Sequence, residues 1–162
     1  GWDLGLSELC VGDVAKIEIP SHLAYGKKGL GTVIPPNTDN WLFVKIHGLV
    51  APDFNEGGVR YWELRSGSEN SKSSSKIKFH MIASTKNKAN IFNTYSSNFP
   101  LTYVSGQKNY PKGLEQVLKK AKNGQHLFLV LESNMAYGDK GYLDIVMPNE
   151  SVFYNLKIID AE

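Results

Sequence analysis

The feature of this sequence that most constrains its fold is a repeat whose two segments lie 112 residues apart. Residues 1–50 align with residues 113–162 without a gap, and 13 of the 50 aligned pairs are identical. The identities gather at glycines, at prolines and at an Ala-Tyr-Gly triplet, which begins at Ala24 and again at Ala136. At such positions the backbone geometry limits the choice of residue. An offset of this length is typical of whole domains, so the sequence predicts a duplicated domain and not a solenoid.

The repeat also predicts the domain organisation. We expect residues 1–50 to be the C-terminal half of a first domain that is incomplete at its N-terminus. Alone they would leave strand edges unpaired, so we expect the missing strands to come from elsewhere. Residues 51–58 contain one proline and two glycines and are interpreted as a linker, and residues 59–162 as a second, degenerate domain. Six serines and one glycine in residues 66–75 predict a mobile loop.

Most of the predicted elements are strands. Apolar alternation and β-branched residues predict strands at residues 14–19, 42–46, 59–64, 77–83, 101–104, 127–131 and 152–158. One short helix is predicted in each domain. In the second it spans residues 111–122, where apolar residues recur at the spacing of one helix face: Leu114, Val117, Leu118 and Ala121. This order predicts an α+β fold in tandem copies, each an antiparallel sheet wrapped around one short helix.

Four motifs follow one another at fixed intervals: Gly1-Trp2-Asp3-Leu4-Gly5-Leu6, Val11-Gly12, Ala24-Tyr25-Gly26 and Val33-Ile34-Pro35-Pro36. In this order and at this spacing they resemble the second half of an FKBP domain, the tacrolimus-binding class of peptidyl-prolyl cis-trans isomerases. Residues 59–112 resemble the front half of the same family. The tandem arrangement is similar to that of the large two-domain immunophilins.

As residues, the first-segment candidates suit an apolar peptide slot. Trp2 offers a flat floor for a proline ring, and the Tyr25 hydroxyl can donate to a substrate carbonyl. Val33 and Ile34 would form an apolar rim. The residues alone leave open the alternative that Trp2 and Tyr25 are core aromatics. The resemblance implies that Trp2 and Tyr25 are catalytic, and that Val33, Ile34 and Leu42 bind substrate or ligand.

In the second domain the resemblance implies a damaged site. The floor tryptophan is replaced by Leu114, and the tyrosine of the first strand by Met81. The family's Phe-Asp pair reads Phe92-Asn93, which removes a carboxylate. The residue whose N–H normally holds the ligand carbonyl is Pro111, and proline has no N–H. Only Tyr137 is kept, so we expect this domain to be catalytically silent.

The implied activity is isomerisation of prolyl peptide bonds without a cofactor, in protein folding or as a co-chaperone. The implied partners are proline-containing peptides or proteins, macrolides such as tacrolimus, and a heat-shock chaperone reached through an absent downstream domain. The alternative is a non-catalytic FKBP-like scaffold that binds partner proteins. The front half of the first domain would discriminate between them, because it carries the family's remaining site residues.

Composition and charge exclude other classes. A formal net charge of +2 argues against nucleic acid or an anionic membrane as partner. No apolar run approaches the roughly 20 residues of a membrane span. The four histidines have no metal-ligand spacing, so no metal is expected. The single cysteine, Cys10, favours a reducing compartment, and we expect a cytoplasmic protein.

One charge cluster allows two interpretations. Five lysines surround the predicted helix of the second domain: Lys108, Lys112, Lys119, Lys120 and Lys122. They form either a solvated face or a docking patch for an acidic partner.

Overall fold

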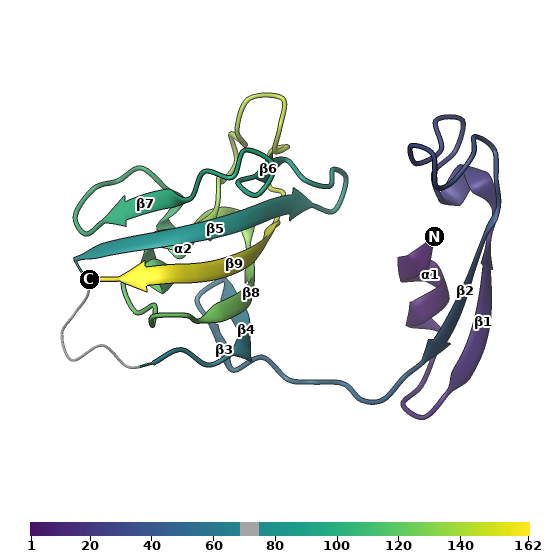
Figure 1. Ribbon diagram of the computed structural model, residues 1–162, viewed down its shortest axis with the longest axis horizontal. Coiled ribbons are helices and arrows are strands. Elements are labelled where there is room, and N and C mark those ends of the chain that lie inside the picture. Colours follow the sequence, from purple (N-terminus) through teal and green to yellow (C-terminus); the bar gives the residue numbers. More distant parts are fainter. Residues whose placement is uncertain (69–74) are drawn as a thin grey trace. The chain divides into compact units, whose positions relative to one another are not determined.

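The computed structural model describes residues 1–68 and 75–162, and the chain forms two compact units, residues 1–50 and 51–162 (Figure 1). The boundary between the units therefore follows Val50. Of the serine-rich stretch predicted as a mobile loop, residues 69–74 lie outside the described residues.

The second unit is an antiparallel sheet with one short helix on it. Its described residues form seven strands, in the order β3-β4-β8-β9-β5-β6 with β7 paired to β5. The strands are β3 (Phe54–Glu56), β4 (Val59–Arg65), β5 (Lys76–Thr85), β6 (Phe92–Asn93), β7 (Leu101–Val104), β8 (His126–Leu131) and β9 (Val152–Ala161). The helix α2 (Lys112–Leu118) precedes β8, and a 3-10 turn, η2 (Ser133–Met135), follows it.

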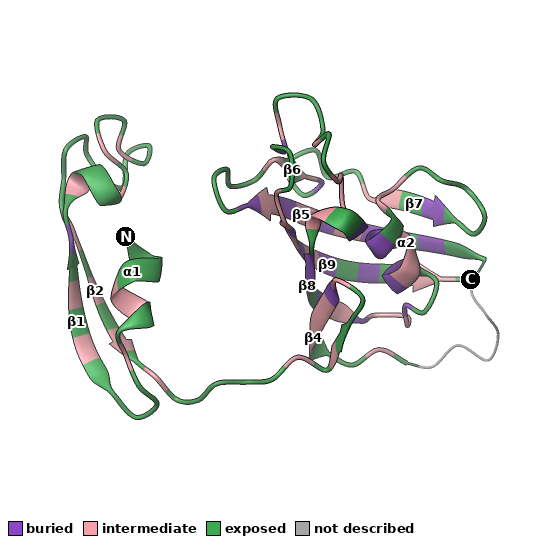
Figure 2. Cartoon of the chain, turned by 180° about the vertical axis from the view of Figure 1, so that it is seen from behind, coloured by how far each residue is buried: buried purple, intermediate pink, exposed green. Residues whose placement is uncertain are grey.

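The core of this unit lies between the sheet and α2. Along β9 the alternate residues Val152, Tyr154 and Leu156 are buried, because successive side chains of a strand point to opposite faces. Leu114 and Leu118 of α2 are fully buried against the same core. Figure 2 shows these buried positions on β5, β9 and α2. Burying each such side chain contributes roughly 1.5–3 kcal/mol, which is why α2 stays on the sheet.

The first unit has a simpler layout. It consists of α1 (Trp2–Ser7), β1 (Val14–Ile19), the 3-10 turn η1 (Ser21–Leu23) and β2 (Asn40–Lys45). Strands β1 and β2 pair only with each other, and no strand from residues 51–68 or 75–162 joins them. Ile19 is the one fully buried side chain of residues 1–50. The described strands of residues 51–162 therefore do not supply the complement expected from the sequence.

The two repeated segments share their backbone pairing. In the first unit the register of β1 with β2 runs from Val14 opposite Lys45 to Ile19 opposite Asn40. Adding 112 to each number gives the register of β8 with β9 without a shift, from His126 opposite Lys157 to Leu131 opposite Val152. The turns η1 and η2 also correspond at this offset.

The loops that precede β2 and β9 correspond as well. A bridge joins Leu30 to Ile34 in the first unit and Tyr142 to Val146 in the second. Gly29 and Gly141 both have a φ of +66°, and at both a Cβ atom would collide with the backbone that follows the bridge. Glycine is required at such a position, which explains why the sequence identities gather here.

Several predicted elements keep their bounds and others change. The strands predicted at residues 14–19 and 101–104 are β1 and β7, and Leu114, Val117, Leu118 and Ala121 are all buried as predicted. The helix predicted at residues 111–122 ends at Leu118, because a turn begins at Lys119. The short strand β6 was not predicted.

Part of the segment interpreted as a linker, residues 51–58, forms a strand. Residues 54–56 are strand β3, which pairs with β4. The Phe54 ring stacks on Tyr61, with centroids 5.3 Å apart. This segment belongs to the second unit, because an aromatic side chain and backbone hydrogen bonds attach it to the sheet. The two glycines that suggested a linker, Gly57 and Gly58, form the turn between β3 and β4, and Pro52 lies just before β3.

Candidate functional site

The five predicted site residues of the first unit lie on four neighbouring features. Trp2 begins α1, Tyr25 follows η1, Val33 and Ile34 lie in the loop before β2, and Leu42 lies within β2. Trp2 is 52% and Tyr25 42% exposed, and Val33 is exposed as well. Ile34 and Leu42 are half-buried. Three of the five side chains are thus exposed and two half-buried, and Ile19 is the one fully buried side chain of residues 1–50.

Their counterparts in the second unit do come together. The residues at the 112-residue offset are Leu114, Tyr137, Ile145, Val146 and Tyr154, and all five line one cleft of about 420 Å³. The cleft is also lined by Met81, Ala83, Ile91, Phe92, Leu101, Lys108, Asn109, Tyr110, Pro111 and Tyr142. Volumes of this size suit a small ligand or a peptide side chain.

The cleft is apolar inside and aromatic at one wall. Leu114, Val146 and Met81 are buried at its surface. Tyr137 and Tyr142 stack with ring centroids 5.0 Å apart and both line the cleft. Tyr142 is 48% exposed, which leaves this wall open to solvent on one side. A ligand side chain that enters would therefore bury apolar area against both surfaces.

A tyrosine hydroxyl is buried beneath this surface. Tyr154 is 1% exposed, and its hydroxyl has no hydrogen-bond partner. Burial raises the pKa of Tyr154 far above its usual range, and the neighbouring Tyr137 raises it further. Tyr137 lies close enough to influence this pKa, but the geometry between the two hydroxyls is not that of a hydrogen bond. Burial likewise raises the pKa of the Tyr137 hydroxyl, so both groups stay neutral at physiological pH.

Four positions were predicted to carry the damage in this site, and the structure places three of them on the cleft. Met81, Pro111 and Leu114 line it. Asn93 does not. Its side-chain oxygen accepts a hydrogen bond from the backbone N–H of Tyr95 at 2.9 Å, so it stabilises a turn. Asn93 lines a neighbouring cleft of about 440 Å³ instead, which shares Ile91, Phe92 and Leu101 with the first.

The side chains that line the cleft suit the binding of an apolar group. Its ionisable side chains are three tyrosines besides Tyr154, and Lys108. Among its lining residues there is no histidine, cysteine or carboxylate. Over the described residues, no cluster of three or more His, Cys, Asp or Glu side chains could hold a metal ion. The described helices include none long and apolar enough to span a membrane.

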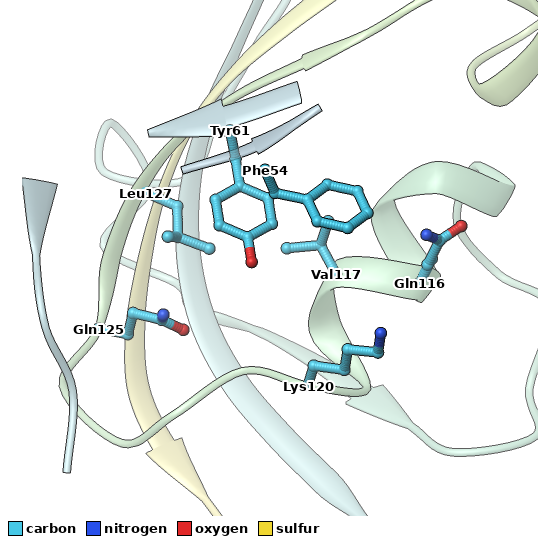
Figure 3. Close-up of a pocket in the computed structure, with 7 residues that line it drawn as sticks. All are labelled: Phe54, Tyr61, Gln116, Val117, Lys120, Gln125 and Leu127. Carbon is cyan, nitrogen blue, oxygen red and sulfur yellow. The ribbon is translucent and has the colours of Figure 1, made fainter. Parts of the chain in front are cut away.

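A smaller pocket lies on another side of α2. Figure 3 shows Phe54 and Tyr61 facing Val117 of the helix, and Lys120 and Gln125 also line this pocket. Its volume is about 50 Å³, which is room for a water molecule and too little for a peptide side chain. We therefore assign the candidate site to the larger cleft.

Sequence reasoning missed part of this lining. Tyr154 could have been found, because it lies 112 residues beyond the predicted site residue Leu42. Tyr142 lies 112 residues beyond Leu30, which was not predicted as a site residue. Ile91 and Leu101 come from the front half of the unit, for which residues 1–50 offer no internal counterpart. No pattern in the sequence marks these two residues as part of a site.

Comparisons with known proteins match most of this chain to one family. The family model described as FKBP-type peptidyl-prolyl cis-trans isomerase matches residues 1–47 and 67–159. Peptidyl-prolyl cis-trans isomerase FKBP10 of Homo sapiens is 30% identical over 99% of this chain, and the chain spans 28% of that relative's length. FK506-binding protein 2 of Yarrowia lipolytica is 58% identical over 38 residues, which are 24% of this chain and 26% of that protein.

A solved structure supports the fold. The N-terminal domain of FKBP42 from Arabidopsis thaliana is similar with a TM-score of 0.60 and 21% identity, over 71% of this chain and 99% of that chain. At this level of identity the likeness concerns the fold alone. It confirms the predicted α+β architecture of an antiparallel sheet with a short helix.

Proposed function

Because this chain belongs to the family of FKBP-type peptidyl-prolyl cis-trans isomerases, we propose that the protein catalyses rotation about prolyl peptide bonds at a site to which residues 1–50 contribute. The observation that carries the proposal is the match between the two segments. Five predicted residues of the first correspond, at one constant offset, to five residues that line a single cleft in the second.

The proposal requires that further strands complete the first domain. In the second unit β8 lies between β4 and β9, and β9 lies between β8 and β5. By the 112-residue correspondence, β1 would take a strand like β4 on its free edge, and β2 a strand like β5. Exposed apolar side chains such as Trp2 and Val33 support this, since a folded domain buries most of its large apolar side chains. In that complete domain the five site residues would surround one slot.

The slot would act without a cofactor. The barrier to rotation about a prolyl amide is roughly 20 kcal/mol, because resonance gives the C–N bond double-bond character. A proline ring on the Trp2 indole leaves water, and a dry site disfavours the charge-separated resonance form. The Tyr25 hydroxyl would donate to a substrate carbonyl. Binding the twisted amide better than the planar one lowers the barrier.

We propose that the second unit does not catalyse this reaction. Leu114 replaces the Trp2 floor, and Pro111 cannot donate a backbone hydrogen bond to a ligand carbonyl. A non-catalytic scaffold remains the second candidate function for the whole protein. It is favoured by one observation: the second unit keeps an apolar cleft although these two groups are gone. A co-chaperone role, macrolide binding and a cytoplasmic location remain predictions.

A protease-coupled assay on a prolyl peptide separates the two functions. The test uses a form of the protein in which the first domain is complete. We expect isomerase activity that tacrolimus inhibits. Binding of prolyl peptides without acceleration of isomerisation would instead establish the scaffold.

A further inference from the structure

The cleft of the second unit has a basic side chain at its surface. Lys108 lines the cleft, and Lys112 begins α2 directly after the lining residue Pro111. Both are exposed. In the described part of the chain the ion pair found is between Lys16 and Glu18, so neither Lys108 nor Lys112 has a carboxylate partner. These two residues, the cleft and its tyrosine wall are referred to below as the basic cleft.

The nearby acidic groups do not neutralise the basic cleft. No aspartate or glutamate lines it. Glu115 of α2 accepts a hydrogen bond from the backbone N–H of Tyr110 at 3.4 Å and forms no ion pair with Lys108 or Lys112 in the described part of the chain. Asp144 lies beside the lining residue Ile145 but is exposed and does not line the cleft. An incoming carboxylate would therefore meet two exposed lysines, neither of them in an ion pair among the described residues, next to an apolar cavity.

The missing N–H at Pro111 also favours recognition of a ligand through its side chains and not through its backbone. Since Pro111 has no N–H, a bound backbone carbonyl loses one donor at this position. Charge on the ligand's side chains can supply specificity in its place. Leu114 puts an aliphatic side chain where the first segment has the flat Trp2 ring, and the neighbouring Met81 can adapt its shape to other apolar groups.

We propose that the basic cleft holds, without isomerising it, a peptide segment in which a bulky apolar side chain is flanked by acidic residues. The apolar side chain fills the cavity beside Tyr137. A neighbouring carboxylate pairs with Lys108. This inference rests on the second unit alone and does not depend on where isomerase activity lies.

Binding of short peptides to the full chain tests the proposal. The probe is Ac-Ala-Glu-Leu-Glu-Ala-NH2, titrated into isotopically labelled protein and followed by amide NMR shifts. We expect shifts at Leu114, Tyr137 and Val146. We also expect binding about three- to tenfold tighter than that of Ac-Ala-Lys-Leu-Lys-Ala-NH2 or Ac-Ala-Glu-Ala-Glu-Ala-NH2, and weaker binding as salt is added. Equal affinity for all three peptides, or shifts that lie away from the cleft, would overturn the proposal.

A pair of charge reversals identifies the residue responsible. Lys108→Glu is expected to weaken binding of the acidic leucine peptide about three- to tenfold and to remove its advantage over the lysine peptide. Lys157→Glu makes the same change on β9, where Lys157 is exposed between the buried residues Leu156 and Ile158 and so points away from the cleft. It should leave binding unchanged. A loss of the same size in both variants contradicts the assignment to Lys108. The fold of each variant is checked in the same amide spectra.

Discussion

At the scale of single residues, two of the five matched site positions differ in the kind of side chain. Trp2 corresponds to Leu114 and Leu42 to Tyr154, whereas Tyr25 and Tyr137 are both tyrosines. The first difference removes a flat aromatic surface. The second places a hydroxyl group in an apolar surrounding, where it has no hydrogen-bond partner. The cleft of the second unit is thus altered in shape and polarity while its backbone stays the same.

The substitution Trp2→Leu tests the role of the indole. It gives the first site the residue of the second, and we expect isomerase activity to fall about five- to hundredfold, because roughly 1–3 kcal/mol of aromatic burial is lost. The matched control is Trp41→Leu. Trp41 is exposed and precedes Leu42 on β2, so it points to the opposite face of the sheet. Both variants are compared in the protease-coupled assay with a complete first domain. An equal loss of isomerase activity in both would indicate that Trp2 has a structural role and does not contact the substrate.

The buried hydroxyl of Tyr154 should make the stability of the second unit depend on pH. Its pKa in the folded state is raised above the ordinary value of 10.0, so the neutral form is favoured by folding. The resulting stability is fully present below about pH 10 and is lost above it, where the unfolded chain ionises first. Between about pH 8 and pH 11 the free energy of unfolding of the unmodified protein should fall. In Tyr154→Phe it should fall less, because the ionising hydroxyl is absent, and urea denaturation at each pH measures the difference. At neutral pH we expect little change, because the hydroxyl has no partner to lose.

At the scale of elements, the loop before β9 depends on its glycines in two distinguishable ways. Gly138 and Gly141 both have a φ of +66°. A Cβ atom at Gly138 would meet nothing within 4 Å, whereas one at Gly141 would collide with the carbonyl of Val146. Gly138→Ala should cost roughly 1–2 kcal/mol through the backbone conformation alone. Gly141→Ala should cost at least about 1 kcal/mol more, because the loop must also shift. Urea denaturation of the two variants measures the difference, and equal costs would contradict the steric argument.

The elements also show what the sequence could and could not predict. Strands with strong alternation, such as β1 and β9, were predicted because one face packs on a core, and so were the buried positions of α2. The end of α2 was predicted four residues beyond Leu118, because nothing in the apolar pattern marks the turn at Lys119. Strand β3 was missed because its three residues lie between turns and attach through Phe54 to a partner strand. Short strands are held by pairing, which local sequence does not record.

Some residues of the candidate site could also be predicted from the sequence and others could not. Leu114 and Tyr137 of the repeated segment were predicted, because the family motifs and the 112-residue offset both mark them. Asn93 was assigned to the cleft on sequence position alone, yet its side chain is used by a turn. Which of several neighbouring polar residues faces a cavity is decided by tertiary packing, and so lies beyond a position-by-position comparison.

At the scale of the whole molecule, the two units differ in how much core they possess. Residues 51–162 enclose a continuous core of buried side chains on both the sheet and α2. Residues 1–50 bury only Ile19 fully. Unit stability follows buried apolar area, and two-stranded sheets are marginal alone. We therefore expect residues 51–162 to unfold cooperatively as an isolated protein, and residues 1–50 to lack a cooperative transition. Thermal unfolding by circular dichroism tests both, and a sharp transition for residues 1–50 would contradict the need for further strands.

The isolated second unit also tests the division of function between the units. Losing the aromatic floor at Leu114 should cost roughly 1–3 kcal/mol of ligand burial, and losing the backbone donor at Pro111 about 1 kcal/mol more. Each 1.4 kcal/mol is about tenfold in affinity, so residues 51–162 should bind tacrolimus about a hundredfold more weakly than a complete first domain, with no measurable isomerisation of a prolyl peptide. Leu114→Trp restores one of the two groups and should recover part of the binding. Without the backbone N–H at position 111 it should not recover activity. Activity of unmodified residues 51–162 comparable with that of the complete first domain would show that Leu114 and Pro111 do not occupy the positions assigned to them.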